Sequence, residues 1–241
     1  MKAIIFAAGL GTRFKPWTDT HPKALAIVNG KTLLQRNIEY LQQFNIYEVV
    51  INVHHFADQI INSVKTNNGW GSKISISDER TEVLETGGGL LNAQKYFTKK
   101  ESFILCNVDV LTNLNINALQ LFHQQNKPLI SFGVTNRVSS RNFLFDNTNR
   151  LCGWENNNTN EKKIAINHSP LIAKAYSCVA ILDYSIFDLM IKNNFSGKFS
   201  LTDVYLKLAS SHTILGFDHS GDKFLDVGKP ESVAIAETIF S

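Results

Sequence analysis

The residues best suited to chemistry begin near the N-terminus. Gly9, Gly11 and Arg13 follow a short apolar run that reads as a strand. Lys23 comes later, after two prolines that stiffen the intervening segment. Glycine lets the backbone turn tightly and present N–H groups to an anion, and arginine binds phosphate oxygens through paired hydrogen bonds. A Gly-x-Gly pair alone is equally compatible with an ordinary turn, but all these residues together predict a phosphate-binding loop.

Two familiar nucleotide-binding motifs are excluded. A dinucleotide fingerprint needs a glycine where Phe14 stands and an acidic residue at the end of the second strand, where the chain has Asn52–His55. Gly30-Lys31-Thr32 resembles the end of a Walker A loop, but the earlier glycine of that motif would fall at Leu25. Gly30 therefore reads as a turn ahead of a helix.

Two aspartates occupy positions where ligands bind in open α/β sheets. Asp109 follows the apolar run Phe103–Cys106, and Asp226 follows a second apolar run and precedes a Gly-Lys-Pro turn. Ligands bind in such sheets at the carboxyl ends of the strands. Taken singly, either aspartate is more simply explained as a turn or helix-cap residue.

The motifs in their order along the chain resemble those of the nucleotidyltransferases that make nucleoside-diphosphate sugars from sugar 1-phosphates. The resemblance covers almost the whole chain. Within the family, the chain resembles the uridylyltransferases of N-acetylmuramic acid 1-phosphate most and is also similar to the guanylyltransferases of mannose 1-phosphate. The segments that carry it are Ala7-Ala8-Gly9-x-Gly11-Thr12-Arg13-x-x-Pro16-x-Thr18, Pro22-Lys23-x-Leu25, Val28-x-Gly30-Lys31, Leu84-Glu85-Thr86-Gly87-Gly88-Gly89, Asn107-Val108-Asp109 and Leu225-Asp226-Val227-Gly228-Lys229-Pro230.

The resemblance implies attack by a sugar 1-phosphate on the α-phosphorus of a nucleoside triphosphate, UTP or GTP, with release of pyrophosphate. It implies Mg²⁺ as cofactor, held by Asp109 and Asp226, which supply the carboxylates that this ion favours. Arg13 would bind the β- and γ-phosphates, and Lys23 the α-phosphate and the incoming phosphate. UTP with N-acetylmuramic acid 1-phosphate is the favoured pair, suggesting a role in cell-wall recycling, and GTP with mannose 1-phosphate is the alternative.

The same resemblance implies the remaining site residues. The nucleotide-binding residues are Ala7, Ala8, Gly9, Gly11, Thr12, Asp78, Thr86, Gly87 and Gly88, and the sugar-binding residues are Asn107, Glu155 and Thr202. Thr86–Gly89 could instead be a plain helix N-terminus, and Thr202 could cap a helix. The chain departs from many relatives at Val108 and Cys178, where they carry glycine, and at Glu155-Asn156-Asn157, which lacks their Glu-Lys-Pro element.

The elements that must position these residues alternate in the first half of the chain. This alternation predicts βαβ units, and hence an α/β fold with a Rossmann-like, mostly parallel sheet sandwiched by helices, as in the nucleotide-diphospho-sugar transferases. The predicted strands are 2–6, 48–53, 73–77, 102–107 and 129–134, and the predicted helices are 32–44, 56–64, 90–97 and 114–125.

The second half has a mixed α+β pattern with Asn-rich turns. Its predicted strands are 143–145, 151–154, 163–166 and 173–182, followed by helices near 186–191 and 201–209 and a strand–loop–helix at 224–240. We therefore expect one catalytic domain in two parts, a nucleotide-binding half (1–135) and a sugar-binding half (136–241) that carries the second metal carboxylate.

Composition excludes several other classes of protein. The 24 basic and 21 acidic residues give a net charge of +3 without a basic stripe, which argues against nucleic acid as a partner. No apolar run approaches the ~18 residues of a membrane span. The three cysteines lack C-x-x-C spacing and are expected to be reduced in a cytoplasmic protein.

Two other functions remain as alternatives. A GT-A glycosyltransferase would usually show Asp-x-Asp at the metal site, whereas this chain has Asn107-x-Asp109 and the full glycine-rich loop. A non-catalytic regulatory domain would normally lose residues such as Arg13 or Lys23, which are present. The sequence leaves the oligomeric state open.

Overall fold

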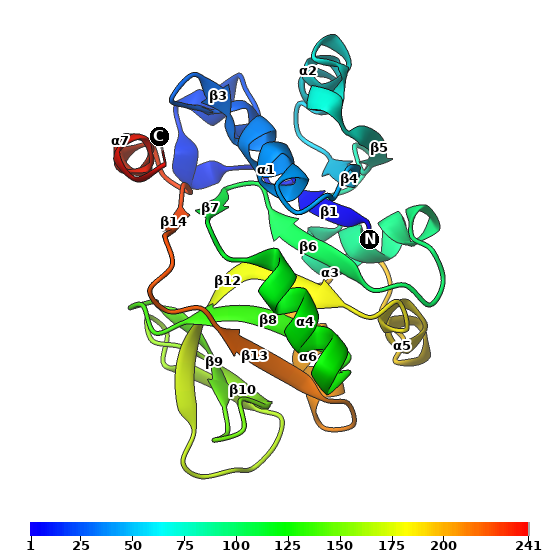
Figure 1. Ribbon diagram of the computed structural model, residues 1–241, viewed down its shortest axis with the longest axis vertical. Helices are drawn as coiled ribbons and strands as arrows, with labels where there is room; N and C mark the ends of the chain where they lie inside the picture. Colours follow the sequence, from blue (N-terminus) through cyan, green and yellow to red (C-terminus); the bar gives the residue numbers. More distant parts are fainter. Residues whose placement is uncertain (241) are drawn as a thin grey trace.

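The computed structural model describes residues 1–240 and contains a ten-stranded mixed β-sheet with helices on both faces (Figure 1). The first half builds its parallel part: β1 (Ala3–Phe6) lies between β4 (Glu48–Val53) and β6 (Phe103–Asn107), and β5 (Lys73–Asp78) extends the sheet beyond β4. Because these strands are parallel, their carboxyl ends meet at one edge. The predicted α/β fold is confirmed, with a sheet that is only partly parallel.

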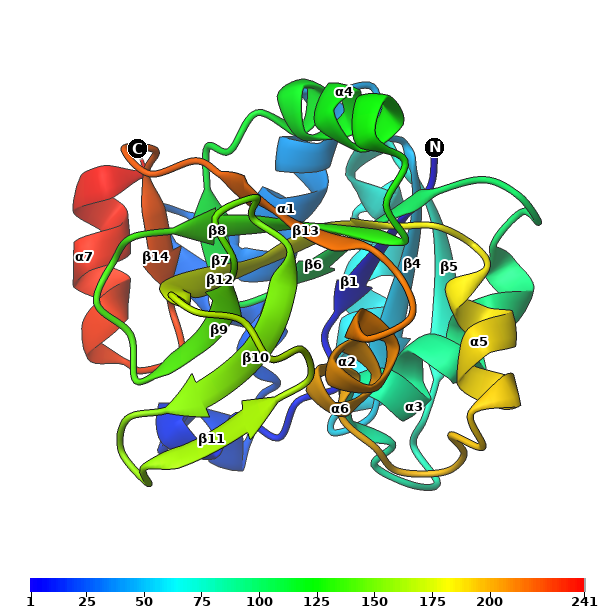
Figure 2. The ribbon, with the colours of Figure 1, turned by 90° about the horizontal axis from the view of Figure 1, so that it is seen from below.

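The long strand β12 (Ile172–Leu182) joins the two halves of the chain. It pairs antiparallel with β6, β8 (Ile130–Thr135) and β9 (Arg141–Phe145), while β13 (Ile214–Asp218) adds to β8 in parallel. Beyond β9, the strands β10 (Leu151–Asn156) and β11 (Glu161–Ile164) form a meander, seen toward the viewer in Figure 2. The sheet thus continues across residue 135, and the division of binding roles between the two halves stays a prediction.

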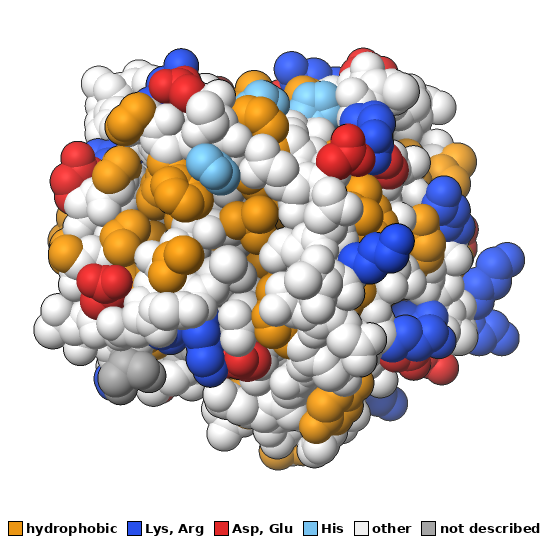
Figure 3. Space-filling view, turned by 90° about the horizontal axis from the view of Figure 1, so that it is seen from above, with side chains coloured by type: hydrophobic (Ala, Val, Ile, Leu, Met, Phe, Trp, Pro, Cys, Tyr) orange, Lys and Arg blue, Asp and Glu red, His pale blue; other side chains and the backbone are white. Residues whose placement is uncertain are grey.

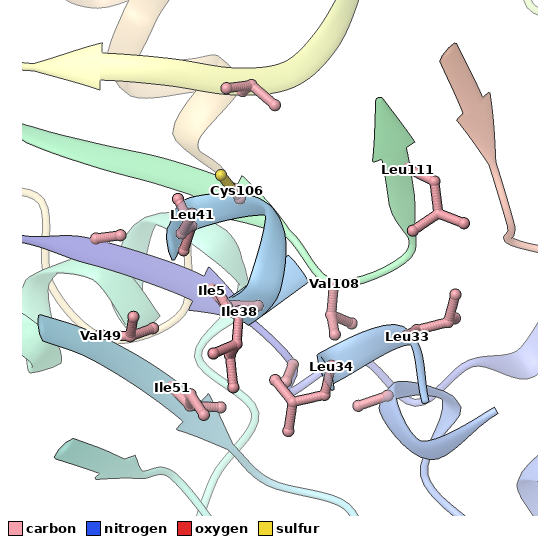
Figure 4. Close-up of a cluster of buried hydrophobic side chains, with 14 of the residues drawn as sticks. Ile5, Leu33, Leu34, Ile38, Leu41, Val49, Ile51, Cys106, Val108 and Leu111 are labelled. Atoms are coloured by element: carbon pink, nitrogen blue, oxygen red, sulfur yellow. The ribbon is translucent and has the colours of Figure 1, made fainter. Parts of the chain in front are cut away.

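Alternation along the strands produces one hydrophobic core on each face of the sheet. Ile5 of β1 packs on the face covered by α1 (Leu33–Gln42), α2 (Ala57–Thr66), α4 (Ile116–Asn126) and α7 (Glu231–Ile239). Its neighbour Ile4 packs on the face covered by α3 (Glu85–Asn92), α5 (Ile186–Lys192) and α6 (Leu201–Ala209). Figure 4 shows how the apolar side of α1 lies against Ile5 and Ile51. Both faces of the central strands are therefore buried, as expected for parallel strands.

Two short two-stranded ribbons complete the fold. One pairs β2 (Ile27–Val28) with β3 (Lys31–Thr32), and the other pairs β7 (Val110–Thr112) with β14 (Phe224–Asp226). The predictions missed β2, β3, β7 and β13, which are short or lack clear alternation. They also began the third helix at Leu90, whereas α3 starts at Glu85 and contains all three consecutive glycines.

The surface agrees with the mixed composition. On the face in Figure 3, basic and acidic side chains are interspersed with exposed hydrophobic ones. Among the described residues, no helix is long and apolar enough to cross a membrane. All three cysteines are free; Cys106 and Cys152 are buried, and Cys178 is partly exposed.

Candidate active site

The glycine-rich loop after β1 is held by a hydrogen bond from the side chain of Thr18. Gly11 has a φ of 62°, in the left-handed region that favours glycine, and its carbonyl accepts a 2.8 Å hydrogen bond from Thr18 Oγ1. A Cβ at Gly11 would lie 2.8 Å from Thr18 Cγ2 and 3.3 Å from Lys23 Cβ. The loop therefore packs tightly against Thr18 and Lys23. Arg13 lies in the short 3-10 turn that follows Gly11 (Thr12–Phe14).

The ribbon of β7 and β14 brings the two predicted metal carboxylates together. Asp226 pairs with Val110 across this ribbon, and Val227 N–H donates to the carbonyl of Asp109 at 2.8 Å. The buried Asn37 side chain supports the same turn by donating to the Val108 carbonyl at 3.0 Å. Val108 itself points into the core, so it does not narrow the site (Figure 4).

Each of the two carboxylates has a cationic neighbour. Lys23 Nζ forms an ion pair with Asp109, and both side chains are largely buried. The Arg13 guanidinium lies 3.9 Å from Asp226 Oδ2, and both of these side chains are about half exposed. A Cβ at Gly228 would lie 2.6 Å from Asp226 Oδ1 and 2.7 Å from Arg13 Nη2. A larger residue at position 228 would therefore clash with the side chains of Arg13 and Asp226, which approach each other here.

The donor set fits a magnesium ion. Partial burial and the nearby negative charge of Asp109 raise the pKa of Asp226, although Arg13 and Lys23 oppose this effect. A bound cation would reduce the repulsion between the two carboxylates. The described part of the chain contains no group of three or more His, Cys, Asp or Glu residues that could together hold a metal ion. Two carboxylates with the remaining positions left to water and phosphate is the arrangement that suits Mg²⁺ in phosphate chemistry.

A cavity of about 650 Å³ opens beside the two aspartates. It contains five of the predicted site residues, Arg13, Asn107, Asp109, Thr202 and Asp226. Trp154 and Asn156 of β10 also line it, whereas Glu155, between them, does not. Since alternate residues of a strand face opposite sides, Glu155 points away, and the structure does not place this predicted sugar-binding residue in the cavity.

Several predicted backbone contacts to the nucleotide are engaged within the chain. Ala7 N–H donates to Asn52 Oδ1 at 2.7 Å. Gly87 and Gly88 N–H groups donate to the carbonyl of Phe199 at 2.9 and 3.3 Å. In the structure, these three donors are satisfied internally, so a nucleotide would have to displace their partners to use them. Ala8 and Gly9, with Thr12, keep a partly or fully exposed position on the loop.

The side chains of Thr86 and Asp78 are also engaged. Thr86 Oγ1 accepts from the backbone N–H of Leu201 at 3.0 Å, which ties α3 to α6. Asp78, at the end of β5, accepts hydrogen bonds from both the backbone N–H and the side-chain Nε of Arg80, the shortest at 2.8 Å. The next residue, Glu79, is buried, and its Oε1 accepts from Asn52 Nδ2 at 3.0 Å.

Sequence reasoning missed the polar residues that support the loop and the cavity wall. Asn52 bridges Ala7 and Glu79, and burial raises the pKa of the Glu79 carboxyl. The signal available in the sequence was a polar residue inside the apolar strand Glu48–Val53. Arg137 was missed because it lies in an irregular segment; it donates to the carbonyl of Tyr176 at 2.6 Å, and its guanidinium lies 3.8 Å from the centre of the Phe224 ring.

The fold and the site define a class of protein. The family model described as "Nucleotidyl transferase" matches residues 2–143. The chain belongs to this family, the sugar-1-phosphate nucleotidyltransferases.

Individual relatives differ in nucleotide and in the length of the match. The chain is 39% identical over 109 residues to an N-acetylmuramate alpha-1-phosphate uridylyltransferase of Caulobacter vibrioides, a match that covers 44% of this chain and 45% of that protein. It is 30% identical over 236 residues, 96% of each chain, to a D-glycero-alpha-D-manno-heptose 1-phosphate guanylyltransferase of Campylobacter jejuni. Among solved structures, HddC from Yersinia pseudotuberculosis complexed with GMP-PN aligns with a TM-score of 0.77 and 25% identity, over 100% of this chain and 99% of that chain.

Proposed function

We propose that this protein transfers a nucleotidyl group from a nucleoside triphosphate to a sugar 1-phosphate in a Mg²⁺-dependent reaction. A bond forms between a phosphate oxygen of the sugar and the α-phosphorus, and the bond from the α-phosphorus to the β-phosphate breaks, releasing pyrophosphate. The observation that carries the proposal is the convergence of two cations and two carboxylates at the carboxyl edge of the sheet.

This reaction asks for charge neutralisation and positioning more than for a base. A phosphate monoester has a second pKa of about 6, so the attacking oxygen is already anionic at neutral pH. Lys23 would bind the α-phosphate and the incoming sugar phosphate, and Arg13 the leaving pyrophosphate. Lys23 is paired with Asp109 and Arg13 lies 3.9 Å from Asp226, so both cations already lie beside the proposed metal carboxylates.

Asp109 and Asp226 would hold the magnesium ion, in keeping with the fit described above. Bound there, Mg²⁺ would neutralise charge on the phosphates. The chain's own part is to fix the spacing of the two carboxylates through the β7–β14 ribbon and to orient Lys23 and Arg13 on either side of them.

For the substrates, we propose UTP with N-acetylmuramic acid 1-phosphate. The sugar cavity is lined by Arg137 and Arg141 in addition to Arg13. In the described part of the chain, no acidic side chain pairs with Arg141, which is exposed at the start of β9. N-acetylmuramic acid carries a carboxylate that this cation would attract, and mannose does not. GTP with mannose 1-phosphate or a similar sugar is the alternative, supported by the relative matched over almost its full length and by the GMP-PN complex.

The test is pyrophosphate release with Mg²⁺, crossing the common nucleoside triphosphates with a panel of sugar 1-phosphates. Release from one pair, and none from nucleotide alone, is expected. Arg141→Gln should raise KM for N-acetylmuramic acid 1-phosphate about tenfold, while Arg141→Lys, which keeps the charge, should have a smaller effect. Absence of turnover with every pair, from folded protein that binds nucleotide, would contradict the proposed reaction.

A further inference from the structure

Three polar side chains form a connected chain beside the sugar cavity. Ser177 Oγ lies 2.7 Å from His219 Nε2, and His219 Nδ1 lies 3.3 Å from Asp222 Oδ2. Ser177 is completely buried, the His219 side chain is 2% exposed and the Asp222 side chain 37%. Buried polar groups of this kind are expensive unless satisfied, so the three residues form a specific link.

The arrangement serine, histidine, aspartate is that of the catalytic triad of hydrolytic enzymes, but these three residues cannot act as a catalytic triad. A catalytic serine must reach its substrate. Tyr176 and Cys178 line the cavity, whereas Ser177 does not and has no exposed surface. Its hydroxyl points to the opposite side of β12, toward His219. The role of this link must therefore be sought in what it holds in place.

One end of the link holds an irregularity in β12 at the floor of the cavity. Tyr176 pairs with Val134 of β8, but the next pair is Ala180 with Phe132, so three residues of β12 oppose the single Gly133. At the centre of this bulge Cys178 has a φ of 54°, a left-handed conformation that is uncommon for residues other than glycine, asparagine and aspartate. Contacts with residues outside the bulge must stabilise this conformation, and the hydrogen bond between Ser177 and His219 is one such contact.

The other end of the link holds the entry to β14. Asp222 directly precedes Lys223, whose backbone N–H donates to Asn113 Oδ1 at 2.7 Å and whose carbonyl accepts from Thr112 Oγ1 at 2.9 Å. Asp226 follows at the end of the same strand. His219 is itself tied to β8, because its backbone N–H donates to the Val134 carbonyl at 3.0 Å.

We propose that Ser177, His219 and Asp222 act as a strut that sets the cavity floor at Cys178 against the strand carrying Asp226, with His219 as the positioning residue. The strut touches neither substrate nor metal. It acts on the sugar pocket and the carboxylate pair together, through the two segments it joins. The consequence for turnover rests on the proposed function; the geometric consequence at Cys178 does not.

The geometric test uses Cys178, a partly exposed residue that lines the cavity, whereas Cys106 and Cys152 are buried. Its thiol is largely buried, so the wild-type protein should be labelled slowly. The rate of maleimide labelling is measured on the folded protein. Ser177→Ala and His219→Asn should each raise the rate at least tenfold, and the double variant should add little because the two changes break one link. His168→Asn, at an exposed loop histidine, is the matched control, and Cys178→Ser identifies the labelled thiol.

The second readout is kinetic. In His219→Asn, KM for the sugar phosphate and the Mg²⁺ concentration for half-maximal rate should both rise about tenfold, with no comparable change in KM for the nucleotide. Unchanged labelling in folded His219→Asn, or a lower Tm with unchanged labelling and kinetics, would overturn the strut. A wild-type protein without turnover would contradict the proposed function only, because the labelling comparison would still decide whether the strut exists.

Discussion

The same substitution should have different effects at the two glycines of the nucleotide loop. Gly9→Ala should weaken nucleotide binding, whereas Gly11→Ala should destabilise the fold. An added Cβ at Gly9 meets no atom within 4 Å, and the φ of Gly9 lies outside the left-handed region. Gly9→Ala should therefore change the free energy of unfolding by less than about 1 kcal/mol. If the nucleotide lies against this backbone, the methyl group occupies its space, and nucleotide affinity should fall at least tenfold, about 1.4 kcal/mol.

Gly11→Ala should instead lower the free energy of unfolding. The left-handed conformation costs alanine roughly 1 kcal/mol, and the contact of 2.8 Å with Thr18 Cγ2 adds roughly 2 kcal/mol of overpacking. A total of about 3 kcal/mol corresponds to a fall in Tm of roughly 6–12 °C for a chain of this size.

Thermal unfolding and calorimetric titration with magnesium-bound UTP and GTP measure both effects. A Gly9→Ala protein of normal Tm and normal affinity for both nucleotides would refute the placement of the nucleotide against Gly9. A Gly11→Ala protein with an unchanged Tm would refute the account of the loop's closure.

Two further predictions concern single carboxylates. Asp109→Asn should lower kcat about a hundredfold or more, because the amide loses the negative charge proposed to bind the metal. Its Tm should also fall, because the largely buried Lys23 loses its ion pair, so turnover is compared at a temperature where the variant is folded; near-normal turnover would remove Asp109 from the metal site. Burial opposes ionisation of Asp218, but its hydrogen bond from Lys174 outweighs this effect and lowers the pKa of Asp218 from 3.8 to about 2. The Lys174–Asp218 pair should therefore stabilise the fold above about pH 4 and lose this effect as the pH falls toward 2. The difference in Tm between the wild type and Asp218→Asn should disappear over that range.

The sequence predicted the central strands well because hydrophobic runs between turn signals are a local property. The helices around Leu33 and Leu201 were also predicted, since amphipathic spacing is local too. The predicted helix at Leu90 began too late because glycine disfavours helices by itself. Packing overrides this preference: a Cβ at Gly87 would clash with Phe199 Cδ2, and a Cβ at Gly88 would clash with the Gly197 carbonyl oxygen.

The candidate site was predictable only in part, for a similar reason. Arg13, Lys23, Asp109 and Asp226 lie in motifs that can be read one segment at a time, and the structure brings all four together. The polar links around them join residues far apart in the chain, such as Asn52 to Ala7. Pairings of this kind depend on strand order and register, which no single segment encodes.

The pairing of Lys23 with Asp109 and of Arg13 with Asp226 has a consequence for the order of events. In the structure, Lys23 is paired with Asp109 and Arg13 lies beside Asp226, so each of the four charges has an opposite charge nearby. A metal ion alone must compete with Lys23 for Asp109, and phosphates alone must draw the cations from the carboxylates. When both arrive together, every charge exchanges one partner for another. Metal and nucleotide should therefore strengthen each other's binding, and the protein should take them up as a single complex.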